Sequence, residues 1–247
     1  MISLSAQRAR MSAQPRSDKD SRTRLLEFLQ TSEVPVLLDL FCGAGGAAYG
    51  YWQAGWMVVG VDNLRQRHYP FPFYQADALD FLEWTGDVFD AYHASPPCQA
   101  FSRTKRRVAR RLRRHVNLID VVRDEFQALS PDRLWVIENV EDAPLRDPTV
   151  LCGTMFDIPS YRHRLFESNV PLTAPAHPKH VAKSADLGRT AKPGQFYQWI
   201  GSCPDVSAAR LHMGVHWMSS REVSQVVPPA YTAFIGSQLL AYYARRL

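Results

Sequence analysis

Cysteine is scarce in this chain of 247 residues, and no two cysteines lie close together. The four are Cys42, Cys98, Cys152 and Cys203, and no Cys-x-x-Cys pair occurs. This spacing argues against a zinc site and against a disulfide framework, and it fits a reducing, cytoplasmic compartment. We therefore expect no metal, and we assign Cys152, Cys203 and the pair His177 and His180 to structural roles.

Long apolar runs are also missing. None approaches the ~20 residues of a membrane span, which argues against a membrane protein. The first twenty residues carry charges and serines without an apolar stretch, so we expect a disordered arm rather than a secretory signal. Internal repeats and low-complexity tracts are absent as well, and the length suits one core domain with a small appendage.

Acidic residues are absent from residues 103–114, where eight of twelve residues are Lys or Arg. Without these eight charges the formal net charge of +5 would become negative, so the basicity of the chain is local. A run of charge is usually a solvated face. This run begins just after Cys98, which indicates that a polyanion lies beside that thiol.

The segment Ser95-Pro96-Pro97-Cys98 follows an apolar run that predicts a buried strand over 88–93. The two prolines fix their own φ and restrict the residues before them, so the segment cannot be helical. It forms a stiff platform that holds one thiol at the end of a strand. A lone cysteine is most often a small buried hydrophobe, but the surroundings of Cys98 point to a nucleophile.

The rest of the chain alternates between strand and helix patterns. We predict strands at 36–40, 57–61, 72–74, 88–93 and 134–137, and helices at 21–30, 47–54, 78–84, 116–129 and 231–243. This alternation predicts an α/β fold with a doubly wound, mostly parallel sheet. We divide the chain into an arm (1–33), a core domain (34–168), a loop-rich appendage (169–212) and a C-terminal segment that packs back on the core (213–247).

Three glycines lie between the first strand and its helix, in Phe41-Cys42-Gly43-Ala44-Gly45-Gly46. They let the backbone approach a ligand closely, as in nucleotide-type cofactor sites. Asp62 ends the second strand, where it can accept hydrogen bonds from ribose hydroxyls. Asp77 can accept from an exocyclic amine such as that of adenine, cap the helix 78–84, or do both. Phe41, Asp62, Cys98 and Glu138 all fall at the carboxyl edge of the predicted sheet.

Four segments together resemble signature motifs of the cytosine-C5 DNA methyltransferases. They are 39–46 (Asp-Leu-Phe-Cys-Gly-Ala-Gly-Gly), 96–102 (Pro-Pro-Cys-Gln-Ala-Phe-Ser), 138–140 (Glu-Asn-Val) and 162–164 (Arg-His-Arg). The resemblance covers about 36–167 and the C-terminal helix. It implies a Rossmann-like, S-adenosylmethionine-dependent methyltransferase, with 34–168 as the catalytic and cofactor-binding domain and 169–212 as a small target-recognition region.

The resemblance also implies roles for single residues. Cys98 would add to C6 of a flipped-out cytosine, Glu138 would act at N3, and Arg162 and Arg164 would hold the O2 of the base. A Glu in that role needs a pKa above its ordinary value. The residues assigned to the cofactor are Asp39, Phe41, Gly43, Gly45, Asp62, Asp77, Pro97, Gly236 and Ser237. Those assigned to DNA are Gln99, Ser102, Arg103, Lys105, Arg106, Arg107 and Arg110, on a loop that closes over phosphates.

The chain departs from the family pattern at several positions. Ser160 stands where Gln is usual, Asp62 where Glu is usual, and Gly236-Ser237 where Gly-Asn is usual. The usual Arg-Leu-Gln-Gly-Phe-Pro segment has at best a degenerate counterpart in 221–228. With a recognition region of only 44 residues, we expect a short target sequence or weak specificity.

Double-stranded DNA is the expected partner, with a monomeric enzyme in the cytoplasm of a bacterial or phage-infected cell. Restriction–modification, phage self-protection and a regulatory mark are all open as biological roles. The same chemistry on RNA or a cytosine nucleotide is an alternative, although eight basic residues within twelve positions suit a mononucleotide poorly. A catalytically silent DNA-binding relative is a third possibility, disfavoured because Cys98, Glu138, Arg162 and Arg164 are all present.

Overall fold

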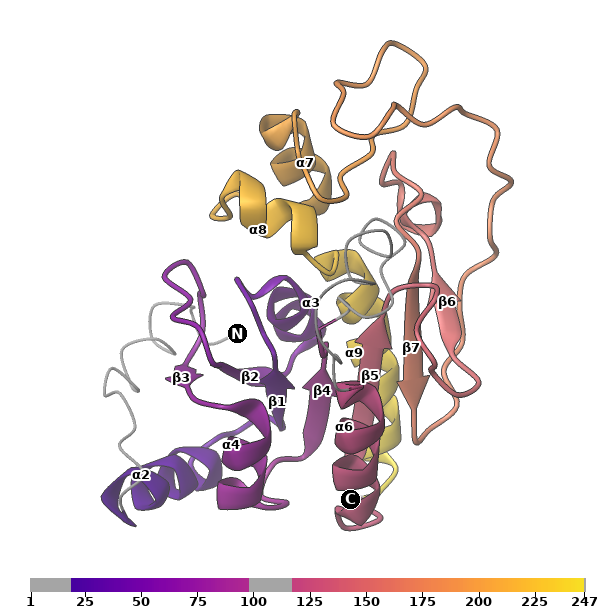
Figure 1. Cartoon of the computed structure of the whole chain (residues 1–247). Helices are drawn as coiled ribbons and strands as arrows, with labels where there is room; N and C mark the ends of the chain where they lie inside the picture. The colour runs from indigo at the N-terminus through magenta and orange to yellow at the C-terminus, as the bar shows by residue number, and fades with distance from the viewer. Residues whose placement is uncertain (1–18, 98–116, 247) are drawn as a thin grey trace.

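The computed structural model describes residues 19–97 and 117–246 (Figure 1). Within them lies a seven-stranded sheet of order β3-β2-β1-β4-β5-β7-β6. Its strands are β1 (Val36–Leu40), β2 (Met57–Asp62), β3 (Phe73–Gln75), β4 (Ala91–Ala94), β5 (Leu134–Asn139), β6 (Thr149–Leu151) and β7 (Arg164–Ser168). The first five are parallel, whereas β7 runs antiparallel to β5 and to β6. The predicted mostly parallel sheet is confirmed.

Helices cover both faces of this sheet. They are α2 (Lys19–Gln30), α3 (Gly46–Ala54), α4 (Ala78–Thr85), α6 (Leu118–Ala128), α7 (Val206–Met213), α8 (Ser220–Gln225) and α9 (Pro229–Ala244), with a 3₁₀ helix η2 (Gly153–Phe156). In β1, Leu37 packs with α3 and α9, whereas its neighbours Leu38 and Leu40 pack with α2, α4 and α6. Successive strand residues point to opposite faces, so the sheet is doubly wound as predicted. Among the described residues, no helix has the length and apolar character needed to cross a membrane.

The strand order reverses at β1, which lies between β2 and β4. In open α/β sheets, ligands bind beyond the carboxyl ends of the strands at such a switch point. Here the glycine loop leaves β1 and the Pro96-Pro97 segment leaves β4. In Figure 1, α7, α8 and the long loop before them lie beyond this edge of the sheet.

Several boundaries differ from the sequence-based prediction. Strand β4 is shorter than 88–93, because its pairing with β1 begins only at Ala91, opposite Leu37. The expected division between residues 212 and 213 cuts through α7, which continues to Met213 and ends where Gly214 turns left-handed, at φ 68°. The antiparallel pair of β6 and β7 was not predicted, since strands of three and five residues are too short to show a clear period.

A buried ion pair joins α6 to β7. Nε of Arg123 lies 2.6 Å from Oε1 of Glu167, and Nη2 lies 2.9 Å from Oε2. The two side chains are only 1% and 5% exposed. The sequence shows no sign of this contact, because 44 residues separate the partners.

Replacing Arg123 with alanine leaves the carboxylate of Glu167 buried without its main partner. We expect Arg123→Ala to lower the free energy of unfolding by about 3–5 kcal/mol. Urea denaturation followed by circular dichroism measures this change. Arg146→Ala, at an exposed side chain, is the control and should change it by less than about 0.5 kcal/mol. Equal urea midpoints for the two variants would contradict a stabilising role of the Arg123–Glu167 ion pair.

Candidate active site

The loop after β1 adopts backbone angles that few side chains tolerate. Phe41 has a φ of 58°, Gly43 of 50° and Gly45 of 85°. A residue other than glycine in this region is uncommon, and such residues cluster at ligand sites. A Cβ added at Gly43 would meet no other described atom within 4 Å. The backbone at Gly43 is therefore open to the close approach of a ligand.

Asp62, at the end of β2, is tied to this glycine loop. Its Oδ2 accepts a hydrogen bond from the backbone N–H of Gly43 at 3.1 Å, and Oδ1 accepts from Leu64 at 2.9 Å. Each carboxylate oxygen has two lone pairs, so capacity remains for further donors. This placement is compatible with the predicted ribose contact.

Asp77 caps α4, as one of the two predicted roles requires. Its Oδ1 accepts from the backbone N–H groups of Leu79 at 2.9 Å and Asp80 at 3.3 Å. The residue follows β3 at the same edge of the sheet. Contact with an adenine amine stays a prediction.

Asp39 is a fully buried carboxyl group within β1. Neither of its oxygens has a hydrogen-bond partner of good geometry among the described residues. Burial raises the pKa of Asp39 well above its ordinary value, and the nearby charges of Asp62 and Glu138 raise it further. The backbone N–H of Ala48 acts in the opposite direction, but it makes no hydrogen bond of good geometry with either oxygen. A poorly satisfied buried acceptor is costly, so this group is suited to a donor or cation that a ligand would bring.

Glu138, on β5, is 5% exposed and paired with a cation. Its Oε1 lies 3.0 Å from Nε of Arg164. Register explains the pair, because Glu138 stands opposite Phe166 and Arg164 projects from the same face of β7 two residues away. Burial raises the pKa of Glu138, while Arg164, a hydrogen bond from Ser95 and the charge of Arg162 act in the opposite direction. The net shift is upward, so the carboxyl group keeps its proton to a higher pH than an ordinary Glu.

A chain of polar groups leads from α3 to Glu138. The hydroxyl of Tyr51 lies 2.9 Å from Nδ1 of His93, and Nε2 of His93 lies 2.9 Å from Oγ of Ser95, which bonds Glu138. Burial lowers the pKa of His93 to about 3, so the ring is neutral. A neutral ring donates at one nitrogen and accepts at the other. Because Ser95 donates its proton to Glu138, its oxygen accepts from Nε2–H of His93, and Tyr51 donates to Nδ1. Sequence reasoning missed this chain, although His93 is a polar residue in an otherwise apolar strand.

Asn139, the last residue of β5, holds the segment that leads to Cys98. Its Nδ2 donates to the carbonyl of Pro96 at 3.0 Å, and its Oδ1 accepts from the N–H of Val140 at 2.9 Å. The side chain is 1% exposed. Glu138 and the start of the Pro96-Pro97 segment are therefore neighbours at one edge of the sheet.

A curated protein shares much of this sequence. Over 121 aligned residues the chain is 35% identical to the type II methyltransferase M.HgiGI of Herpetosiphon aurantiacus, and the match spans 92% of that protein and 44% of this chain. The chain belongs to the cytosine-C5 DNA methyltransferase family. The resemblance of its motifs to this family is thereby confirmed. No family model matches the chain.

Solved structures confirm the fold. One is described as a DNA modification methyltransferase encoded within a prophage of E. coli, with a TM-score of 0.58, 12% identity and coverage of 85% of this chain and 99% of that one. Another is the Dnmt2 methyltransferase of S. pombe, with a TM-score of 0.53, 13% identity and coverage of 84% and 98%. At such identities the likeness concerns the Rossmann-like fold alone.

Membership in the family brings S-adenosyl-L-methionine as the cofactor, and two features of this methyltransferase fit it. The donor carries a positive ammonium and a positive sulfonium, and Asp39 is a buried carboxyl group without a partner of good geometry in the described structure. The open backbone at Gly43 lets a ligand lie against the loop. Asp39, Gly43 and Asp62 are the residues that would hold it.

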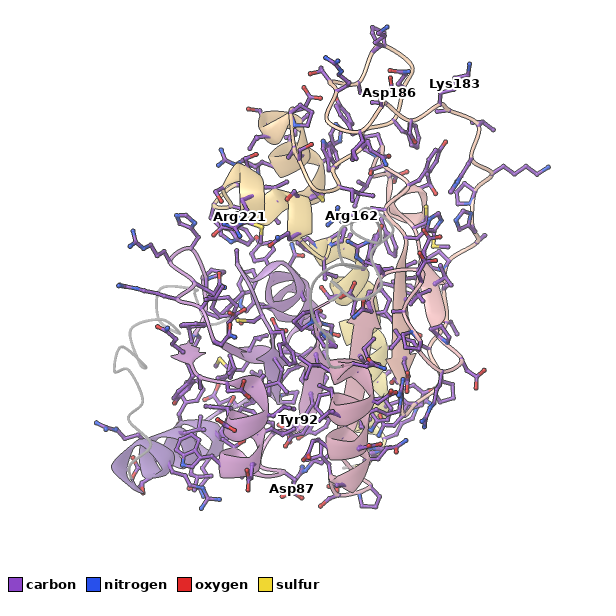
Figure 2. The ribbon with its side chains drawn as sticks, in the orientation of Figure 1. Asp87, Tyr92, Arg162, Lys183, Asp186 and Arg221 are labelled. Atoms are coloured by element: carbon purple, nitrogen blue, oxygen red, sulfur yellow. The ribbon has the colours of Figure 1, made fainter. Side chains whose placement is uncertain are left out.

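Arg162 makes contacts that sequence reasoning did not predict. Its Nε donates to the carbonyl of Val226 at 3.0 Å, Nη1 to Trp199 at 2.5 Å and Nη2 to Ser224 at 3.0 Å. Figure 2 labels it where β7, α8 and the start of α9 approach one another. These bonds use three of the five N–H donors of the guanidinium, so the contact with the O2 of the base stays a prediction. The same bonds fasten the appendage and the C-terminal segment to the catalytic domain.

Gly236 and Ser237 are misassigned as cofactor contacts. A Cβ at Gly236 would lie 2.9 Å from the side chains of Tyr51 and Ala54, so this glycine allows α9 to pack on the end of α3 remote from the loop. The hydroxyl of Ser237 donates to the carbonyl of Ala233, and the residue is exposed.

Residues just before α9, and not Gly236 and Ser237, contact the glycine loop. A Cβ at Gly46 would lie 2.1 Å from the side chain of Val226 and 2.7 Å from the carbonyl of Val227. Nε1 of Trp217 donates to the carbonyl of Ala44 at 2.9 Å. These residues back the glycine loop, and local sequence pattern contained no signal for them.

The remaining predicted residues follow Pro97, which is exposed and directly precedes the undescribed segment. Outside the described residues lie Cys98, Gln99, Ser102, Arg103, Lys105, Arg106, Arg107 and Arg110. Their assignments stay predictions.

Asn139→Ala should remove the bond that sets the position of Pro96. Since misplacement of a reacting group by 1 Å can cost ~10²-fold, we expect kcat for methyl transfer to fall about 10- to 100-fold with KM for the cofactor little changed. Asn169→Ala is the matched control, because Asn169 bridges Trp135 and Arg133 at the opposite end of β5. Equal activity losses in the two variants would show a general loss of stability instead.

Proposed function

We propose that this methyltransferase transfers a methyl group to C5 of a cytosine flipped out of double-stranded DNA, through a covalent bond between Cys98 and C6. The observation that carries the proposal is Glu138, buried beside Arg164 with a raised pKa, next to the segment that leads into Cys98. An acid held in this way suits N3 of a cytosine.

The chemistry follows from the electronic demand of the base. S-adenosyl-L-methionine, when bound, supplies an electrophilic methyl group. The thiolate of Cys98 adds to C6, which raises the electron density at C5. The carboxyl group of Glu138 donates to N3 and stabilises the ring in this state, while Arg164 holds Glu138 in place. Once C5 carries the methyl group, its proton is lost to solvent, the C5–C6 double bond forms again, and the bond from C6 to the sulfur of Cys98 breaks to release the thiolate.

A duplex substrate requires base flipping, because C5 is not accessible to this chemistry inside the stack. The basic residues of 103–114 support a polyanion over a mononucleotide. RNA is the second candidate, since phosphate attraction does not distinguish the two polymers. A silent DNA-binding relative is disfavoured by the intact pair of Glu138 and Arg164. We further propose that the enzyme is monomeric and cytoplasmic, and that it belongs to a restriction–modification system or to a phage.

The test supplies labelled S-adenosylmethionine with duplex DNA, RNA or deoxycytidine monophosphate, and identifies the modified nucleoside. We expect label in DNA, as 5-methylcytosine. Label in RNA alone would move the substrate to RNA, and label at N4 of cytosine or N6 of adenine would refute the C5 chemistry. No transfer to any substrate would favour the silent relative.

A further inference from the structure

Four side chains of types that can ligate a metal meet beside the start of β7. Ligand atoms of Cys152, His163, His177 and His180 all lie within 4.8 Å of one another. We assigned Cys152, His177 and His180 to structural roles as isolated residues, but the structure brings these three together with His163. The fold brings Cys152, which follows β6, and His163, which precedes β7, to the loop that carries His177 and His180. Cys203 is buried elsewhere and is not part of the cluster.

The distances match the edges of a tetrahedral site. Zinc bonds of ~2.3 Å to sulfur and ~2.0–2.1 Å to nitrogen place neighbouring donors roughly 3.3–3.6 Å apart. Here Sγ of Cys152 lies 3.4 Å from Nε2 of His180, and Nε2 of His163 lies 3.2 Å from Nε2 of His177. Two imidazole nitrogens that face each other in this way are both satisfied as acceptors when a cation lies between them.

The ring nitrogens that face away from the cluster lie next to hydrogen-bond acceptors, as they do in histidines that bind metals. Nδ1 of His163 lies 3.4 Å from Oε1 of Glu141, and Nδ1 of His177 lies 2.8 Å from the carbonyl of Pro178. A carboxylate or carbonyl on the second nitrogen fixes the tautomer that presents Nε2 to a metal. Oγ1 of Thr154 lies 3.1 Å from the sulfur of Cys152, and the ring of His180 stacks on Tyr161 at 3.7 Å.

We propose that Cys152, His163, His177 and His180 form a structural site for a tetrahedral divalent cation, Zn²⁺ by its donor set. One thiolate and three imidazoles are ligands of a borderline-soft metal, and four protein ligands leave no position open for catalysis. Cys152 releases its thiol proton to solvent when the ion binds. Because His177 and His180 are exposed, the ion can reach the site from solvent.

The site would anchor the appendage to the catalytic domain. Cys152 and His163 belong to the edge of the sheet, whereas His177 and His180 belong to the loop that Figure 2 shows continuing to Lys183 and Asp186. His163 directly precedes Arg164, the partner of Glu138. The ion therefore orders the base of the recognition region and the start of β7 together.

Metal analysis of the untagged full chain tests the site. We expect one zinc per chain, and with Co²⁺ alone a thiolate-to-cobalt charge-transfer band together with the intense visible bands of tetrahedral coordination. Cys152→Ser and His177→Ala should each lose stoichiometric zinc, and His177→Ala replaces an exposed side chain if Cys152→Ser fails to fold. Glu141→Gln should keep the metal with an affinity lowered about 10- to 100-fold.

Cys203→Ser and His216→Ala are matched controls that should bind zinc as the natural chain does. Removal of zinc by a chelator should also speed tryptic cleavage after Lys179, Lys183 and Arg189, which are exposed beside the site. The proposal is overturned if the natural chain binds no zinc, or if Cys152→Ser and His177→Ala bind it with unchanged affinity.

Discussion

Glu138→Gln is expected to lower kcat for methyl transfer by about 10²- to 10⁴-fold, the usual contribution of a general acid or base. Glutamine keeps the size and the hydrogen-bonding capacity of the side chain but cannot give up a proton at N3. Its neighbours Arg164 and Ser95 remain in place, so cofactor binding should change little. Steady-state kinetics with labelled cofactor measures the loss.

The proposed role of Glu138 also predicts the direction in which the rate changes with pH. Burial raises the pKa of Glu138, so its protonated form persists to a higher pH than that of an ordinary Glu. Activity that needs this proton is full below the raised pKa and falls as the pH rises through it. Arg164 lowers the pKa of Glu138, so Arg164→Ala should move this fall to higher pH. Glu138→Gln should abolish it.

Glu125→Gln, on the exposed face of α6, is the control for general effects of losing a carboxylate. It should leave both the rate and the pH profile unchanged. A Glu138→Gln enzyme within a few-fold of the natural rate, with the same alkaline limb, would remove Glu138 from the chemistry.

Cys98→Ala is expected to abolish methyl transfer, because no other group in the proposal activates C5. Binding of S-adenosylmethionine should survive, since the groups that would hold the cofactor lie at the glycine loop and Asp62. Calorimetric titration of the cofactor alongside the activity assay separates the two effects. Cys203→Ala, at a buried cysteine among the described residues, is the control and should retain activity. Residual transfer by Cys98→Ala comparable to that of the control would refute a covalent role for this thiol.

Much of the fold was predictable because its central strands are short apolar runs. The runs 36–40 and 134–137 are buried on both faces, and such strands can be recognised by their apolar composition. The location of the site followed from the topology, because the carboxyl ends of parallel strands meet at one edge of the sheet. Glu138 and Asp62 therefore both lie near Asp39 of β1, and Asp62 bonds the glycine loop.

The parts that were missed depend on contacts between distant residues. The motif singled out Arg162, but it did not predict the bonds from its guanidinium to carbonyls 37 to 64 residues away. The cluster of Cys152 with three histidines spans two strands and a loop, and no local spacing reveals it. Gly236 was assigned by its place in a motif, although its role depends on how closely α9 packs on α3.

The central claim, a covalent bond between Cys98 and C6 of a cytosine in DNA, is tested most directly by trapping it. A DNA duplex with 5-fluorocytosine at the methylated position, incubated with enzyme and S-adenosylmethionine, should give a complex that survives denaturation, because fluorine at C5 cannot leave as the proton does. Mass spectrometry should find one strand joined to the peptide that carries Cys98, and none with Cys98→Ala. Methylation of the unmodified duplex without any such adduct, or an adduct on another residue, would contradict the account.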